Sequence, residues 1–320
     1  MSNIASYYLV NSQKLQRHYK KRISGYKDWA QLSHAEDYLL YPENMSDKLS
    51  IDEVSLSKGE LYTFVTNKKT KVKNKQSVVA VINGTQAKTI QEILEKIPLE
   101  KRNQVKEVSM DMARNMGLAI DNSFPNSKKV IDRFHVVRLV MDAMQHLRVK
   151  LRWKAIEEEN TAIKKAKDTR AKYYPEILSN GDTLKELLAR SRYLLYKFEQ
   201  DWTSNQSKRA AILFEKYPLL KSAYDLTLSF RNIYKNTSPT IALSHFNNWK
   251  EKVIKTEIEE FNTVVNSIEY HLDDILNFFE HRSTNAYAES FNSKIKGFRA
   301  NLRGVTDVKF FLFRLERLFA

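Results

Sequence analysis

The amino-acid sequence predicts a mixed α/β fold in which a sheet of antiparallel and parallel strands is interrupted by a large all-helical insertion. Three short runs rich in β-branched and aromatic residues follow one another from residue 49, and strand-like and helical segments then alternate up to residue 135. From residue 136 to residue 280 the apolar residues recur at the three- and four-residue spacing of amphipathic helices.

The three consecutive runs are predicted to form antiparallel strands. LSIDEVSL alternates apolar and polar residues, SKGE supplies a turn, and LYTFVTN and QSVVAVING follow as the second and third strands. Next come a helix over AKTIQEILEKI, a strand over KEVSMD, a helix over MARNMGLAI and a short strand over KKVID. The order βββαβαβα predicts a mixed sheet with helices on its faces, an architecture that ribonuclease-H-like nucleases share.

Four segments follow from these patterns. Residues 1–48 are expected to be a basic, helical N-terminal segment or linker, and residues 49–135 the first part of the core. Residues 136–280 are expected to form the helical insertion, and residues 281–320 the helices that complete the core. Only 7 Gly and 6 Pro occur, which argues against long flexible linkers.

The composition favours a polyanionic partner. Lys and Arg total 53 against 38 Asp and Glu, a formal net charge of +15 at pH 7, so nucleic acid is the leading candidate. Many basic proteins do not bind nucleic acid, and the charge therefore needs a site to support it. The absence of Cys excludes disulfides, a thiolate nucleophile and cysteine-based zinc sites.

Several other functional classes are poorly supported. The first residues lack the pattern of a secretory signal, and no apolar run is long enough to span a bilayer, so we expect a cytoplasmic protein with no membrane partner. The sequence contains no Gly-rich phosphate loop, no Ser-His-Asp arrangement and no His-x-x-x-His pair. P-loop nucleotide hydrolysis and hydrolytic zinc chemistry are therefore disfavoured.

Two aspartates lie where a sheet could present them to metal ions. Phosphodiester chemistry requires concentrated positive charge, which carboxylates supply by holding two Mg²⁺ ions about 3.5–4 Å apart. Asp52 lies inside the first strand, where its alternative role is a solvent-facing acid, and Glu53 points to the opposite face. Asp111 follows an apolar strand and precedes a helix, so it is either a metal ligand or a helix N-cap, and both roles can coexist.

A third carboxylate, Glu289, lies on a helical stretch near the end of the chain. At 3.6 residues per turn, Asn285, Glu289, Asn292 and Lys296 share one face. A carboxylate, two amides and a cation on one surface suit metal and phosphate, although an ordinary exposed helix face gives the same pattern.

Asp132 and His135 form a further candidate element at the end of the fifth strand. An imidazole near a metal cluster could orient a ligand, contact the scissile phosphate or bond to Asp132. The alternative is a packed pair at a helix cap.

The sequence around these residues resembles the DDE transposases with a ribonuclease-H-like core, specifically the ISL-three group of bacterial insertion sequences. The resemblance rests on SIDEVSLSKGELYTFV, VSMDMARNM, FPNSKKVIDRFHVVRLVMDAM and TNAYAESFNSKIKGFRANLRG. It covers roughly residues 49–320, and DRFHV followed by AESFNSKIK is its most specific part.

The resemblance implies roles for the candidate residues. Asp52, Asp111 and Glu289 would be the metal ligands for two Mg²⁺ or Mn²⁺ ions, and Asp132 and His135 an auxiliary Asp-x-x-His element. The helical insertion would separate the second acid from the third.

Basic segments are candidate DNA-backbone surfaces, because Lys and Arg neutralise phosphates without reading bases. They span residues 148–154, 164–172 and 294–303. The residues expected against DNA are Lys296, Lys294, Arg299, Arg303, Asn292, Arg148, Lys150 and Arg152.

The resemblance further implies cleavage of DNA at the terminal repeats of an insertion sequence, strand transfer into target DNA, and a homo-oligomer on DNA. Members of the group carry an N-terminal cysteine zinc finger and a helix-turn-helix, whereas only 48 residues precede the core here. We therefore expect either a separately encoded DNA-binding protein or a truncated copy. The alternatives are a nuclease of the same fold that cuts without joining and a non-catalytic, transposase-derived DNA-binding protein, although all three acids are present.

Overall fold

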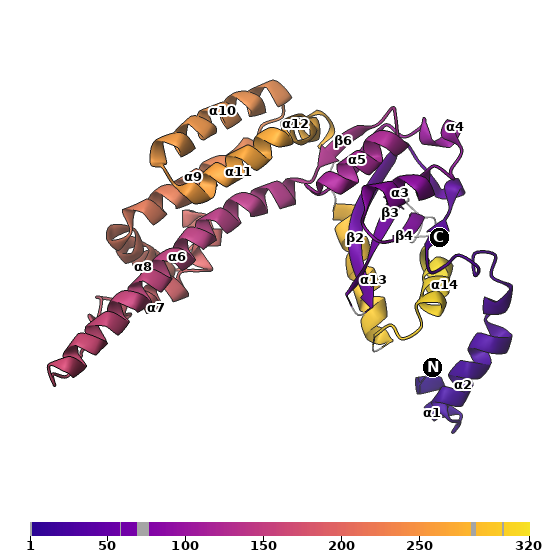
Figure 1. Ribbon diagram of the computed structural model, residues 1–320, viewed down its shortest axis with the longest axis horizontal. Helices are drawn as coiled ribbons and strands as arrows, with labels where there is room; N and C mark the ends of the chain where they lie inside the picture. Colours follow the sequence, from indigo (N-terminus) through magenta and orange to yellow (C-terminus); the bar gives the residue numbers. More distant parts are fainter. Residues whose placement is uncertain (1, 58, 69–76, 283–285, 303) are drawn as a thin grey trace. The chain divides into compact units, whose positions relative to one another are not determined.

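The computed structural model describes residues 2–57, 59–68, 77–282, 286–302 and 304–320 (Figure 1). The chain divides into two compact units. The sheet unit comprises Met1–Asp132 and Ser283–Ala320, and the helical unit comprises Arg133–Arg282. No helix in the described ranges is both long enough and apolar enough to cross a membrane.

The sheet unit contains a six-stranded mixed sheet with the strand order β1-β4-β3-β2-β5-β6. The strands β1, β4, β3 and β2 pair antiparallel, and β2–β5 and β5–β6 pair parallel. The three successive antiparallel strands and the later strands expected from the sequence are confirmed. Their bounds are β1 (Tyr38–Leu40), β2 (Lys48–Ser57), β3 (Glu60–Asn67), β4 (Val78–Asn83), β5 (Glu107–Met110) and β6 (Lys128–Ile131).

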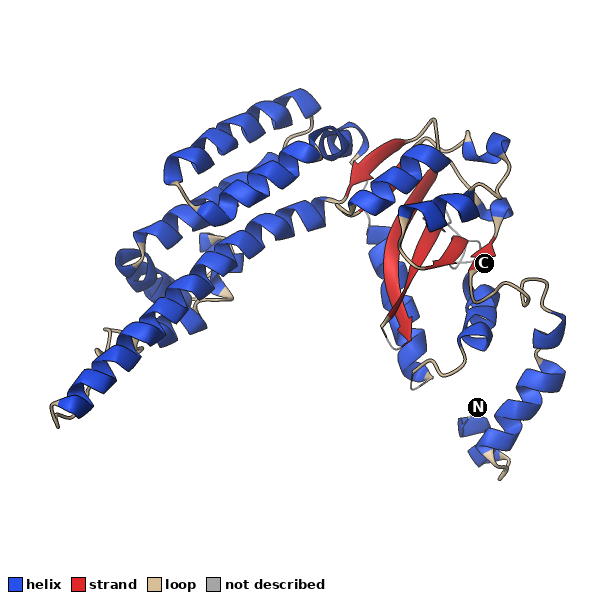
Figure 2. Cartoon of the chain, in the orientation of Figure 1, coloured by secondary structure: helices blue, strands red, loops and turns tan. Residues whose placement is uncertain are grey.

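Helices cover both faces of this sheet (Figure 2). On one face, Ile51 and Val108 pack with apolar residues of α3 and α5. On the other, Val54 and Phe64 pack with residues of α13 and α14, because alternate residues of a strand point to opposite faces. The helices of this unit are α1 (Ser2–Tyr7), α2 (Ser12–His18), α3 (Ala87–Leu94), α4 (Leu99–Arg102), α5 (Arg114–Ser123), α13 (Ala286–Asn301) and α14 (Val308–Phe319).

Residues 1–48 are expected from the sequence to be a basic, helical segment or linker that precedes the core, but part of this segment is built into the sheet. Its residues 38–40 form β1, the edge strand beside β4, and Trp29 and Tyr41 are buried in the core. Trp29 Nε1 and Tyr41 Oη each donate a 2.6 Å hydrogen bond to Oε2 of Glu316 on α14. This part of the chain therefore belongs to the sheet unit, and it is helical over residues 2–7 and 12–23, with short helical turns at 26–28 and 42–44.

The helical unit contains no strand within its described residues. The unit begins at Arg133 and ends at Arg282, within three residues of the bounds 136–280 that the apolar periodicity predicts. Trp249 and Phe261 are among its fully buried side chains. Its helices are α6 (Arg133–Asp168), α7 (Leu184–Arg190), α8 (Ser204–Lys216), α9 (Pro218–Ile233), α10 (Pro239–Thr256), α11 (Glu259–Tyr270) and α12 (Leu272–His281).

We predict that Glu316→Ala destabilises the sheet unit by about 2–4 kcal/mol, because each buried donor left without an acceptor costs roughly 1–3 kcal/mol. Urea unfolding would measure the change. Tyr41→Phe removes one of the two bonds and should cost about 1 kcal/mol. The exposed Glu100→Ala serves as the control and should change stability by less than about 0.5 kcal/mol. Equal stability of Glu316→Ala and Glu100→Ala would contradict the account.

Candidate active site

Asp52 lies on β2, and Asp111 is the first residue after β5, the strand that pairs parallel with β2. In the pairing of β2 with β5, Ser50 lies opposite Ser109. Two residues further along the chain come Asp52, still within β2 and on the same face as Ser50, and Asp111, one residue beyond the end of β5. Adjacent strands are roughly 4.8 Å apart, so this register brings the two carboxylates together at one edge of the parallel pair.

Both carboxylate oxygens of Asp52 accept hydrogen bonds from the protein. Oδ1 accepts the backbone N–H of Glu53 at 2.8 Å, and Oδ2 accepts Nδ2 of Asn292 at 2.7 Å. Asn292 is only 9% exposed, so its amide is held at the junction between α13 and β2. Each oxygen of an ionised carboxylate has two lone pairs, so a carboxylate can accept hydrogen bonds and bind a cation at the same time.

Asp111 lies in the loop between β5 and α5. Its Oδ1 accepts the backbone N–H of Ala113 at 2.8 Å, which closes an Asx turn. The helix begins at Arg114 with Ala113 at its N-cap position, so the N-cap role considered for Asp111 is wrong. The structure shows no hydrogen bond to Asp111 Oδ2 from the described residues.

Glu289 lies on α13, three residues before Asn292 and therefore about one helical turn away. Its side chain is exposed, whereas Ala288, Phe291 and Ile295 of the same helix are buried. Over the described residues, no group of three or more acidic, histidine or cysteine side chains is arranged to hold a metal ion. The helix that carries Glu289 thus contacts Asp52 through Asn292, but Asp52, Asp111 and Glu289 do not converge on one point. Asn285 lies outside the described residues.

Glu53 adds a further carboxylate close to the pair. Burial and the negative charges of Asp111 and then Asp52 raise its pKa, and a hydrogen bond with Asn115 opposes the shift. Glu53 points to the opposite face of β2 from Asp52, but the charges of the two aspartates still act on it.

Lys68 is a buried cation that the sequence analysis did not single out. Its Nζ lies 2.6 Å from Oγ of Ser109 and 3.2 Å from Oε1 of Glu107, and its side chain is 10% exposed. Burial lowers the pKa of Lys68, and the negative charge of Glu107 opposes this shift. Because Ser109 precedes Asp111 by two residues, Lys68 lies beneath the acidic pair. It opens the Lys-rich stretch KKTKVKNK, where one lysine has no signal that separates it from its neighbours.

The auxiliary residues Asp132 and His135 fall on either side of the unit boundary. Asp132 is buried at the end of β6, and its N–H donates to the Met110 carbonyl at 2.9 Å. The negative charge of Asp132 also opposes the lowering of the Lys68 pKa by burial, so Asp132 lies near that lysine. His135 is half-buried in the first turn of α6.

Arg148 corrects one expectation about DNA contacts. It is 6% exposed, its Nε donates to Oε1 of Gln145 at 2.7 Å, and its Nη1 donates to the Leu188 carbonyl at 2.9 Å. Its guanidinium therefore ties α6 to α7 and does not face a DNA backbone. The signal was present in the sequence, because Arg148 follows Met144 by four residues and lies on the apolar stripe of its helix.

The other basic candidates differ in accessibility. Lys150 Nζ lies 3.5 Å from Glu259 and 3.3 Å from Glu260, and these ion pairs raise its pKa. The ammonium group therefore already has carboxylate partners within the protein. Arg299 is half-buried and donates to the Ser55 carbonyl at 2.9 Å, so it fastens α13 to β2. Arg152, Lys294 and Lys296 are exposed, and Arg303 lies outside the described residues.

Asp52 on β2, Asp111 directly after β5 and the contact of α13 with Asp52 agree with the comparison of this sequence with known families. Residues 49–315 match the family model described as a transposase, of the ISL3 group of DDE transposases. The chain belongs to the ISL3 family of DDE transposases.

A curated relative of this transposase-family chain is the transposase for insertion sequence element IS1001 from Bordetella parapertussis. The two sequences are 22% identical over 275 residues, which cover 85% of this chain and 60% of the relative. The chain thus matches about 60% of the length of that protein.

We predict that Glu53→Gln makes the sheet unit less sensitive to rising pH. The folded pKa of Glu53 is raised above its ordinary value of 4.5, so its contribution to stability is present below that pH and is lost as the pH rises through the folded pKa. As the pH rises above about 4.5, the variant should therefore gain stability relative to wild type in urea unfolding. The exposed Glu60→Gln is the matched control, and an equal gain in the control would refute the assignment.

A second pair of variants separates the structural arginine from an exposed one. Arg148→Met should destabilise the helical unit, by roughly 1–3 kcal/mol for each acceptor that loses its donor. Arg152→Gln should leave thermal unfolding unchanged and reduce the salt dependence of duplex binding by about 0.9 in log–log slope. A stable Arg148→Met protein with weakened DNA binding would contradict this division.

Proposed function

We propose that this chain cleaves DNA at the ends of an insertion sequence in a metal-dependent reaction and joins the released 3′ hydroxyl to target DNA. The observation that carries the proposal is the placement of Asp52 beside Asp111, with α13 fixed against Asp52 by Asn292. Membership of the transposase family supports it.

We further propose that the sheet unit is a ribonuclease-H-like core. The strand order β4-β3-β2-β5-β6, with three antiparallel strands followed by two parallel additions and helices on both faces, supports this assignment. On this account the helical unit is an insertion between the second and third acids of the site.

Asp52, Asp111 and Glu289 would hold two Mg²⁺ or Mn²⁺ ions. Carboxylate oxygens are the ligands these ions prefer, and a cation would offset the negative charges of Asp111 and Asp52, which add to burial in raising the pKa of Glu53. When bound, the ions would stabilise the charge that develops on the phosphate and lower the pKa of the attacking water or 3′ hydroxyl. For Glu289 to join the aspartates, the first turns of α13 must bring its exposed side chain toward Asp52.

The protein groups around the acids have separate tasks. Asn292 orients Asp52, and Lys68 with Glu107 fixes the polar layer below the pair. Asp132 and His135 would orient a ligand or the scissile phosphate. The exposed cations Lys294, Lys296 and Arg152 would neutralise DNA phosphates without reading bases.

The proposed partners are the terminal repeats of the element, target DNA and further copies of this chain. A separately encoded DNA-binding protein would recognise the ends. A nuclease of the same fold would cut the same ends but give no strand-transfer product.

We predict that Asp52→Asn, Asp111→Asn and Glu289→Gln each abolish cleavage of labelled DNA that carries the flanking terminal repeats, in Mg²⁺ or Mn²⁺, while DNA binding is retained. Asn292→Ala should lower the cleavage rate about 10- to 100-fold, the usual cost of losing a group that orients a metal ligand. The matched controls are Glu60→Gln and Asn301→Ala, which should cleave like wild type.

The assay includes any protein encoded next to this gene, as the candidate separately encoded DNA-binding partner, and an unlabelled target plasmid. Cleavage without joined products would replace the transposase by a nuclease. A wild-type protein that binds the ends but stays inert in both metals would overturn the catalytic proposal.

A further inference from the structure

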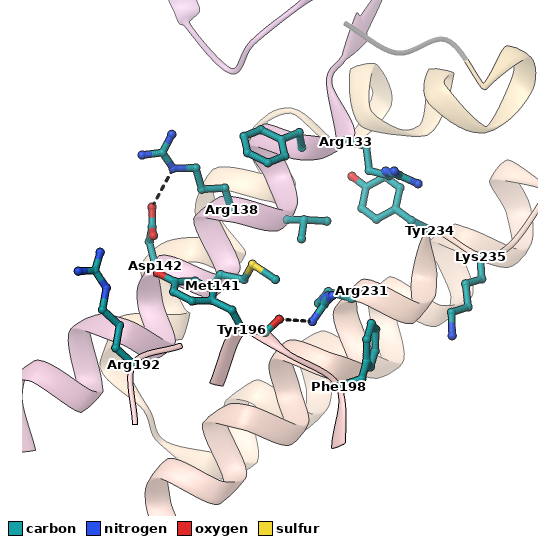
Figure 3. A pocket seen from close by; sticks show the side chains of 12 residues that line it. Arg133, Arg138, Met141, Asp142, Arg192, Tyr196, Phe198, Arg231, Tyr234 and Lys235 are labelled. Atoms are coloured by element: carbon teal, nitrogen blue, oxygen red, sulfur yellow. Dashed lines mark hydrogen bonds and ion pairs between the residues drawn. The ribbon is translucent and has the colours of Figure 1, made fainter. Parts of the chain in front are cut away.

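The helical unit contains a cavity of about 690 Å³ that the proposed chemistry does not use (Figure 3). It is formed within this unit alone, by the first turns of α6, the turn around Tyr196 and the C-terminal end of α9. Its volume lies in the roughly 300–1,000 Å³ range of sites for small organic ligands. Its basic lining residues are Arg133, Arg138, Arg192, Arg231 and Lys235.

The lining is strongly cationic, with five basic side chains and one carboxylate. The carboxylate, Asp142, pairs with Arg138 at 3.5 Å. Among the described residues, no carboxylate forms an ion pair with Arg192, Arg231 or Lys235. An excess of positive charge in a concave site concentrates field lines and favours an anionic ligand.

Aromatic rings are interleaved with these cations. The guanidinium of Arg231 lies 3.9 Å from the ring centroid of Phe198, and its Nη1 donates to the Tyr196 carbonyl at 3.0 Å (Figure 3). Arg231 is therefore held in place before any ligand arrives. Tyr196 is half-buried, and Phe134 is 56% exposed although it is a large apolar ring.

This combination selects among anionic ligands. A duplex backbone that needs only phosphate neutralisation would be served by an open basic surface without a cavity. Phosphate-binding cations interleaved with rings that can stack on a planar group are the pattern of sites for unpaired nucleotides.

We propose that this cavity binds one unpaired nucleotide of DNA, with its base against Tyr196 and the DNA backbone on either side of that nucleotide against Arg192 and Lys235, which lie on opposite sides of the cavity (Figure 3). The inference rests on the proposed function only in taking DNA as the substrate. It adds a preference for distorted or single-stranded DNA that the acidic site does not provide.

The test uses the full chain and two fluorescent duplexes that differ by one unpaired 2-aminopurine nucleotide. Wild type should bind the duplex with the unpaired base about tenfold more tightly than the paired one, and binding should quench the 2-aminopurine because the base stacks. Tyr196→Leu should lose most of the preference and the quenching. The exposed Tyr174→Leu, which does not line the cavity, is the matched control.

The charge is tested in the same way. The double variant Arg192→Gln with Lys235→Gln should weaken binding of the unpaired-base duplex about tenfold beyond Lys208→Gln with Lys252→Gln, two exposed lysines outside the cavity. Thermal unfolding of each variant verifies the fold. Displacement of the probe by an acidic peptide, but not by a short single strand, would instead assign the cavity to a protein partner and overturn the proposal.

The two proposals fail separately. Equal binding of the two duplexes by wild type, with Glu289-dependent cleavage intact, would reject the nucleotide site and leave the transposase. Absence of binding to any DNA would reject the proposed function itself.

Discussion

The hydrogen bond from Asn292 to Asp52 joins residues that are 240 positions apart in the sequence. It fixes α13 against β2 through a polar side chain of the helix. On either side of that contact the helix is held by apolar packing of Phe291 and Ile295 and by the bond from Arg299 to the Ser55 carbonyl. The position of Glu289 along the sheet depends on this clamp, because it precedes Asn292 by a single turn.

The clamp operates in a region where negative charge is concentrated. Asp52 lies on β2 and Asp111 directly after β5, and their charges add to burial in raising the pKa of Glu53. Below them, Glu107 is paired with Lys48 and with the buried Lys68. The lower layer thus carries its own counter-charges.

Sequence reasoning succeeded where the signal is local. Strand alternation and turn residues give β2, β3 and β4, and the same alternation separates Asp52 from Glu53. It failed at β1, because three residues are too few for a periodic pattern, and at Arg148, whose position on an apolar stripe was outweighed by its charge. The partnership of Asn292 with Asp52 and the cavity around Tyr196 depend on residues that the chain brings together from distant segments, and no spacing in the sequence encodes such contacts.

The central claim is that Asp52, Asp111 and Glu289 act together on one cluster of metal ions. Iron-directed cleavage tests it directly: Fe²⁺ replaces Mg²⁺, ascorbate and peroxide generate radicals at the bound ion, and mass spectrometry identifies the backbone cuts. The account predicts cuts near residues 52, 111 and 289 in the same sample, all suppressed by excess Mg²⁺ and by Asp52→Asn. Cuts near the two aspartates with none on α13, or cuts that Asp52→Asn leaves unchanged, would contradict it.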